Sequence, residues 1–193
     1  MRPERSRRGG RRGTAGRLLL PLAVPLFAVS NLLAQTEARM PDSTTHFPAV
    51  TGRSLTGRTY HLPGDFEGAR NLVLVAFKRH QQEDVDTWTP HLRPLAAGDS
   101  GLRVYELPTL GRGYRLMRGM IDGGMRRGIP DSAVRAATIT LYINKTPFRD
   151  TLGITDESRI HVLLVDRSGR ILWRAEGRYT ADAEAELEKV LGP

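Results

Sequence analysis

The residues best equipped for chemistry lie between positions 80 and 86, where an apolar run gives way to a helical pattern. His80 and Asp84 are four positions apart, so on a helix they would share one face and could bind a divalent metal. Few further ligands are nearby, and acids such as Glu83 and Asp86 in a first helical turn are usually solvated and complement the helix dipole. We therefore expect no metal here.

Two neutral amides occupy the same stretch. Gln81 and Gln82 offer donors and acceptors that suit a peptide or a carboxylate but cannot exchange electrons. The chain contains no cysteine, which excludes thiol nucleophiles, disulfides and thiolate metal sites. Its five histidines are dispersed, and no Gly-x-Ser-x-Gly elbow or Ser-His-Asp arrangement is present. We predict no catalytic residue and no cofactor.

A second candidate site lies in the glycine- and arginine-rich segment 118–130. Arg118, Arg126 and Arg127 could form an anion-binding loop, because glycine frees the backbone and guanidinium groups bind oxyanions. The segment lacks the Lys-Ser/Thr ending of a P-loop and has no G-x-G-x-x-G after a strand. The alternative is a helix end and a loop with solvated arginines.

The net charge of +8 is concentrated at the N-terminus. Residues 1–34 hold seven of the 29 basic residues and one acid, so the rest of the chain has a net charge of +2. A domain near +2 lacks the positive field of a nucleic-acid binder. A protein or peptide partner is expected instead.

The N-terminal segment has the pattern of an export signal. Arginines precede an apolar run of 17 residues, Leu18 to Ala34, which is interrupted by Pro21 and Pro25 and is short for a spanning helix. We predict a signal peptide over 1–34, a flexible linker over 35–46 and one domain over 47–193. The protein is then periplasmic or extracellular, with a membrane-anchored form as the alternative if the signal is not cleaved.

Periodicity predicts an alternating α/β order in the domain. The expected elements are a hairpin within 47–63, strands at 72–77, 102–107, 138–143, 161–165 and 171–175, and helices around 85–96, 116–121 and 183–191. Pro90 and Pro94 should kink the first helix.

This order resembles the thioredoxin-like superfamily over residues 47–191. The resemblance implies an α/β three-layer sandwich, with a central mixed sheet flanked by helices, an N-terminal β-hairpin, and a helical and extra-strand insertion before the closing hairpin. It places the family's two cysteines at Gln82 and Val85, and the second of these positions is five residues before the helix proline Pro90. It places the family's cis-proline near Ile160. Both halves of the redox site are therefore absent.

Leu62-Pro63, Trp88 and the segment around Trp173 are similar to the mitochondrial ATP synthase assembly factor family and its bacterial redoxin-like relatives, which implies a non-redox assembly or chaperone-like role. We predict an exported, redox-inactive protein that binds a protein or peptide. The predicted groove consists of His80, Gln81, Gln82, Val85, Trp88 and Ile160. The alternatives are a redoxin or peroxidase-like oxidoreductase by fold that lacks thiols, and an anion-binding protein that uses the arginine loop.

Overall fold

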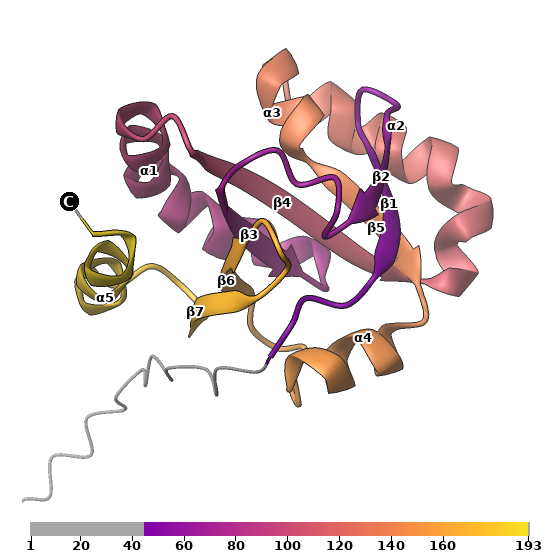
Figure 1. The fold of residues 1–193 in the computed structure, drawn as a ribbon. Helices are drawn as coiled ribbons and strands as arrows, with labels where there is room; N and C mark the ends of the chain where they lie inside the picture. Colours follow the sequence, from indigo (N-terminus) through magenta and orange to yellow (C-terminus); the bar gives the residue numbers. More distant parts are fainter. Residues whose placement is uncertain (1–44, 193) are drawn as a thin grey trace, which may run out of the picture. The chain divides into compact units, whose positions relative to one another are not determined.

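The computed structural model describes residues 45–192, so the predicted signal peptide and most of the predicted linker lie outside the described residues. Seven strands form one mixed sheet (Figure 1). They are β1 (Val50–Ser54), β2 (Thr59–Leu62), β3 (Arg70–Ala76), β4 (Leu102–Gly111), β5 (Ile139–Ile143), β6 (His161–Asp166) and β7 (Ile171–Glu176). The helices are α1 (Gln82–Gly98), α2 (Arg118–Gly128), α3 (Ser132–Ala137), α4 (Lys145–Leu152) and α5 (Ala181–Leu191), with short 3-10 helices η1 (Arg79–Gln81) and η2 (Arg112–Met117).

The strand order is β2-β1-β5-β4-β3-β6-β7. β4 is parallel to both β3 and β5, and the other pairings are antiparallel. The carboxyl ends of the three parallel strands therefore meet at one edge of the sheet, which is the usual place for ligand sites in α/β folds. The start of β6 reaches the same edge, because His161 pairs with Val75.

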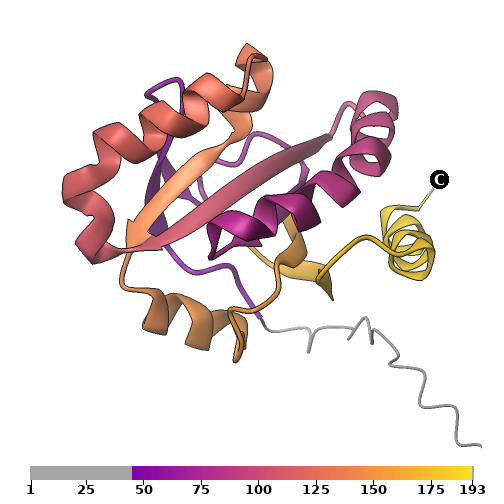
Figure 2. The ribbon, with the colours of Figure 1, turned by 180° about the vertical axis from the view of Figure 1, so that it is seen from behind.

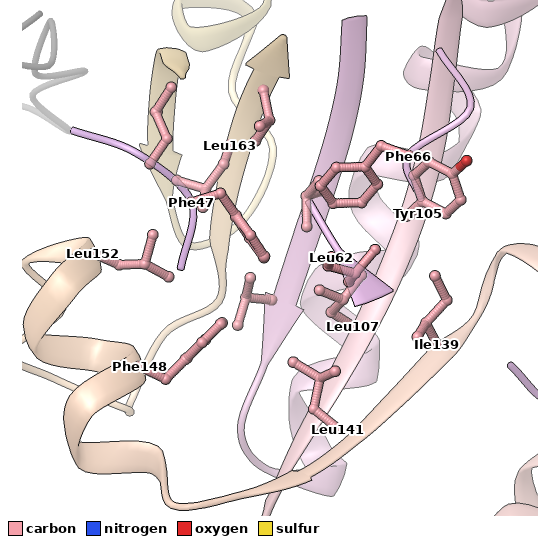
Figure 3. Close-up of a cluster of buried hydrophobic side chains, with 14 of the residues drawn as sticks. Phe47, Leu62, Phe66, Tyr105, Leu107, Ile139, Leu141, Phe148, Leu152 and Leu163 are labelled. Carbon is pink, nitrogen blue, oxygen red and sulfur yellow. The ribbon is translucent and has the colours of Figure 1, made fainter. Parts of the chain in front are cut away.

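Each face of the sheet has its own apolar core. On one face, Val85, Trp88 and Leu92 of α1 pack with residues of α5 and of the strands. On the other face, Phe47, Phe66, Phe148 and Leu152 cover the strands (Figure 3). The two layers of cover confirm the predicted thioredoxin-like sandwich. Residues 72–76 of β3 form an unbroken apolar run, which is typical of a strand buried on both faces.

The N-terminal boundary lies slightly earlier than the sequence indicated. Thr45 and His46 were predicted to be linker, yet the backbone oxygen of Thr45 accepts a hydrogen bond from the Ile171 amide at 3.0 Å. His46 forms an isolated bridge with Arg170. These first described residues are thus part of the folded sheet region.

The insertion between β4 and β6 contains more helix than the sequence pattern predicted. Asn144 caps the N-terminus of α4, since its side chain accepts from the Thr146 amide, and Gly153, with φ 66°, caps the C-terminus. Asp131 caps the N-terminus of α3 in the same way. Both helices are short, and α4 buries only Phe148 and Leu152, so hydrophobic periodicity carried little signal for them.

The prediction of an arginine-rich loop is wrong, because residues 118–128 form the helix α2. Polar contacts hold this glycine-rich helix in place. The Tyr142 hydroxyl donates to Asp122 Oδ1 at 2.7 Å, and Arg126 Nε donates to the backbone oxygen of Leu55 at 2.9 Å. These tertiary contacts override the low helix propensity of glycine.

Candidate functional site

The predicted groove residues come from η1, α1 and the residue before β6, and they lie at the carboxyl edge of the parallel strands. Most of them are not accessible. Gln81, Val85, Trp88 and Ile160 are buried, whereas His80 and Gln82 are exposed. The groove as predicted therefore presents only two of its six side chains to a ligand.

Trp88 is a core residue. Its ring lies edge-on to Trp173 with 6.2 Å between centroids, and its Nε1 donates to the backbone oxygen of Gly177 at 2.9 Å. Val85 lies in the same cluster. The position that the resemblance assigns to the second cysteine is thus filled by a buried aliphatic side chain.

Gln81 is fully used by internal hydrogen bonds. Its Oε1 accepts from the amides of Phe77 at 2.7 Å and Lys78 at 3.0 Å, and its Nε2 donates to the backbone oxygen of Glu157 at 2.8 Å. The side chain therefore joins the end of β3 to the loop that precedes β6. The expectation that Gln81 binds a ligand is corrected, since these contacts occupy both ends of the amide.

The exposed part of this edge is a polar hollow of about 470 Å³. It is lined by Arg79, His80, Gln82, Glu83 and Asp86, and we call it the η1–α1 hollow. Gln82 Nε2 donates to Asp86 Oδ1 at 3.0 Å, across one turn of α1. Of the six predicted groove residues, only His80 and Gln82 line this hollow, and its use as a binding site stays a prediction.

The carboxyl group of Glu106 in β4 interacts with two residues that line this hollow, Gln82 and Asp86. Burial raises the pKa of Glu106, and the negative charge of Asp86 raises it further, while a hydrogen bond from Gln82 opposes the shift. Sequence analysis did not single out Glu106, because an acid within an alternating strand is normally read as exposed.

His80 and Asp84 could share a metal by their spacing alone, but Asp84 has another partner in the structure. Asp84 Oδ1 instead accepts from Arg178 Nη1 at 3.1 Å. Among residues 45–192, no group of three or more His, Asp or Glu side chains is arranged to hold a metal ion.

His161 is a buried residue of this edge that the sequence did not reveal as a site residue. Its Nε2 lies 3.1 Å from the backbone oxygen of Asp156, and its Nδ1 lies 3.5 Å from Glu176. Burial lowers the pKa of His161, which favours the neutral imidazole near pH 7. Phe77 packs edge-on against the ring at 6.1 Å.

A second cavity, of about 320 Å³, opens at the same edge between the ends of β4 and β5 and the start of α4. We call it the α4 cavity. Its lining residues are Gly111, Arg112, Ile143, Asn144, Lys145, Thr146, Arg149 and Glu157. Lys145 and Arg149 both form ion pairs with Glu157, which leaves the lining with more cations than anions.

The three predicted anion-binding arginines do not form one loop site. Arg118 is at the start of α2, and Arg126 and Arg127 are in its last turn. Arg126 is bound to Leu55, so it is directed at the body of the domain. The cationic residues that line the α4 cavity are instead Arg112, Lys145 and Arg149.

Comparison with known proteins supports the fold alone. No protein-family profile and no curated protein matches the sequence. Solved structures do match. One is a thiol:disulfide interchange protein from Bacteroides sp., with 24% identity and a TM-score of 0.51, covering 77% of this chain and 90% of the other.

Two further structures agree with it. BsSco, a member of the Sco family of cytochrome c oxidase assembly proteins, has 13% identity and a TM-score of 0.55, with 82% of this chain and 96% of that chain covered. A thiol-disulfide oxidoreductase from Bacteroides fragilis has 10% identity and a TM-score of 0.50, with 76% and 99% covered.

These matches show that the chain has a thioredoxin-like fold. The chain has no cysteine at any position. Thioredoxin-type thiol exchange is therefore excluded, because it requires a thiolate. The narrower resemblance to ATP synthase assembly factors stays a prediction. No helix among residues 45–192 is long and apolar enough to cross a membrane.

Proposed function

We propose that this chain is an exported, redox-inactive thioredoxin-fold protein that binds a protein or peptide partner through the η1–α1 hollow. The observation that carries the proposal is that hydrogen bonds fix the edge of the sheet beside the hollow, while the chain has no cysteine. Gln81 accepts two hydrogen bonds from the segment that precedes η1 and donates one to the loop before β6, so the surface beside it is held in shape without a disulfide. A preorganised polar surface loses little entropy on binding.

The composition of the hollow supports a polar partner. Arg79, His80, Gln82 and Glu83 offer donors and acceptors of both charges, which suits recognition of a peptide backbone and polar side chains. The α4 cavity at the same edge has surplus positive charge and would accept an acidic side chain of the same partner. An assembly or chaperone-like role is one form that such binding would take.

Export is supported by the sequence of residues 1–34, with its arginine-rich start and short apolar run. The lack of cysteine is compatible with an oxidising compartment, in which free thiols would be oxidised. Enzymatic turnover of the redoxin type has no nucleophile in this chain.

Site-specific photo-crosslinking tests the proposal. A benzophenone amino acid at Gln82 is expected to give a discrete crosslinked partner in cells. The same probe at Arg167 serves as the matched control, since this exposed residue lies in the β6–β7 turn at the opposite end of the sheet. Charge reversal of Glu83 by a Glu83→Arg change should weaken the crosslink. Equal crosslinking from both probe positions would contradict a specific site.

An insulin-reduction assay tests the redox part separately. Wild-type protein should show no activity, and neither should the Gln82→Cys, Val85→Cys double variant, because Val85 is buried and Ile160 replaces the family's cis-proline. Thiol turnover by the wild-type chain would overturn the redox-inactive assignment.

A further inference from the structure

Four large apolar side chains, all within seven residues of the sequence, are exposed around the junction of η2 and α2. The exposed fractions are 54% for Tyr114, 97% for Leu116, 47% for Met117 and 64% for Met120. We call them the α2 patch. They are the exposed large apolar side chains of residues 45–192, and such a grouping marks an interaction surface more often than scattered single residues do.

Tyr114, Leu116 and Met117 belong to η2 and Met120 to α2, and neither of these two helices fully buries an apolar side chain. The only buried residue of α2 is Asp122, which is bonded to Tyr142. A surface helix normally turns its apolar stripe toward the body of the protein. Here the stripe predicted around Leu116, Met117 and Met120 faces outward, and no helix or strand covers the outer side of α2 in Figure 2.

The surroundings of the patch are strongly basic. Residues 111–128 contain five arginines, which are Arg112, Arg115, Arg118, Arg126 and Arg127. Their only acid is Asp122, which is buried. The segment therefore combines exposed apolar side chains with a net positive charge that favours an anionic partner.

We propose that the α2 patch docks the protein onto an anionic lipid bilayer. An interfacial helix of this kind has apolar side chains that enter the boundary between headgroups and acyl chains, while arginines contact the lipid phosphates. Tyr114 suits the headgroup level, because its ring is apolar and its hydroxyl is polar. Leu116, Met117 and Met120 supply the buried apolar area.

The shape of the patch favours a bilayer over a protein partner. Leu116 is almost fully exposed, so it projects from the surface and is not seated in a groove. None of the four apolar residues lines either of the two hollows described above. A fluid bilayer accommodates flexible projecting side chains without a complementary pocket, whereas tight protein contacts concentrate binding energy in well-packed pockets.

The absence of cysteine makes a localised test possible. A single Met120→Cys variant of the full chain is labelled with the environment-sensitive fluorophore NBD and mixed with vesicles of equal parts phosphatidylcholine and phosphatidylglycerol. The emission should shift to the blue and increase. An Arg167→Cys variant with the same label should not respond, and vesicles of phosphatidylcholine alone should give a much weaker response at position 120. Every variant keeps the native N-terminal segment, so any lipid binding by that segment is the same in all variants.

Additional substitutions in the labelled Met120→Cys chain measure the electrostatic and the apolar contributions to vesicle binding. Arg112→Gln with Arg115→Gln should weaken vesicle affinity by roughly 25-fold, at about fivefold for each arginine near an anionic surface. Leu116→Ser should weaken it by roughly tenfold through lost apolar burial. Gln82→Ser, outside the patch, should leave vesicle affinity unchanged, and this separates the present proposal from the partner site at the η1–α1 hollow.

Three results would overturn the proposal. The first is no response of the label at position 120 to anionic vesicles. The second is an equal response at position 167, which would assign the binding to another part of the chain. The third is a response at position 120 to exported proteins in the absence of lipid, with none to vesicles, which would make the patch a protein-binding surface.

Discussion

Helices α1 and α2 are similar in position, since each follows a parallel strand, but they are held by different forces. α1 inserts Val85, Trp88 and Leu92 into the core between the sheet and α5. α2 buries no apolar side chain and is held by hydrogen bonds of Asp122 and Arg126. Apolar burial thus fixes the first helix, and directional polar contacts fix the second.

This difference between α1 and α2 indicates which side of the edge is rigid and which side keeps its apolar side chains exposed. Burial of large side chains contributes several kcal/mol per residue, whereas one hydrogen bond contributes about 1 kcal/mol net. The α1 side of the edge is therefore a rigid frame for a binding surface. The α2 side keeps its apolar side chains available for an external surface.

The largest effect is expected from Trp88→Ala. Removing the fully buried indole leaves a cavity and should lower the free energy of unfolding by about 3–5 kcal/mol, measured by urea denaturation. The matched control is Met120→Ala in α2, which should change stability by no more than about 0.5 kcal/mol. Similar losses in the two variants would refute the contrast between the helices.

Gln81→Leu tests whether the frame depends on a buried amide. The change leaves the amides of Phe77 and Lys78 without their side-chain acceptor and should lower the free energy of unfolding by about 2–3 kcal/mol. Its neighbour Gln82 is exposed, so Gln82→Leu should cost less than about 0.5 kcal/mol. If both variants unfold at the same urea concentration, Gln81 does not brace the edge.

Tyr142→Phe removes the hydroxyl that holds Asp122 of α2. The global loss should be about 1 kcal/mol. Hydrogen exchange gives the more informative readout, since amides of α2 should lose protection while those of α1 keep theirs. An equal loss of protection in both helices would show that they unfold as one unit.

Gly124→Ala should have the smallest effect and the opposite sign. A methyl group at this position meets no atom within 4 Å, and alanine favours helix, so stability should rise by about 0.5–1 kcal/mol in thermal or urea unfolding. Gly169→Ala is the contrasting control. Gly169 has φ 90° and its added methyl would lie 2.7 Å from Pro63, so that variant should be destabilised. A destabilised Gly124→Ala variant would show that α2 is packed more closely than it appears.

The sequence predicted the elements whose side chains repeat regularly. Strands β3 and β6 were found because both of their faces are apolar, and α1 because Val85, Trp88 and Leu92 recur on one helical face. α4 was missed although its boundaries carried capping signals, an Asn at 144 and a Gly at 153. Capping residues are common in loops as well, so they identify a helix only together with a periodic interior.

The candidate site stays a prediction, and the structure corrects which of its side chains are accessible. The thioredoxin-like resemblance pointed to positions 80–86, and the η1–α1 hollow lies there. It did not show that Gln81 points inward, because a buried glutamine has no periodic signature and depends on a partner, Glu157, that is 76 residues away. The direction of the apolar stripe around Met120 was missed for a related reason, since the sequence shows a stripe but not what covers it.

The strand order also has a consequence for how the chain folds. β3 can pair with β6 only late in folding, because Val75 and its partner His161 are 86 residues apart. The same holds for β1 and β5, because Arg53 pairs with Thr140. The β3-α1-β4 unit, the β4-α2-α3-β5 unit and the two hairpins form from residues that are closer in the sequence. Pairings between distant residues slow folding, because a long loop must close before they stabilise anything. The sheet is therefore completed only after most of the chain has been made.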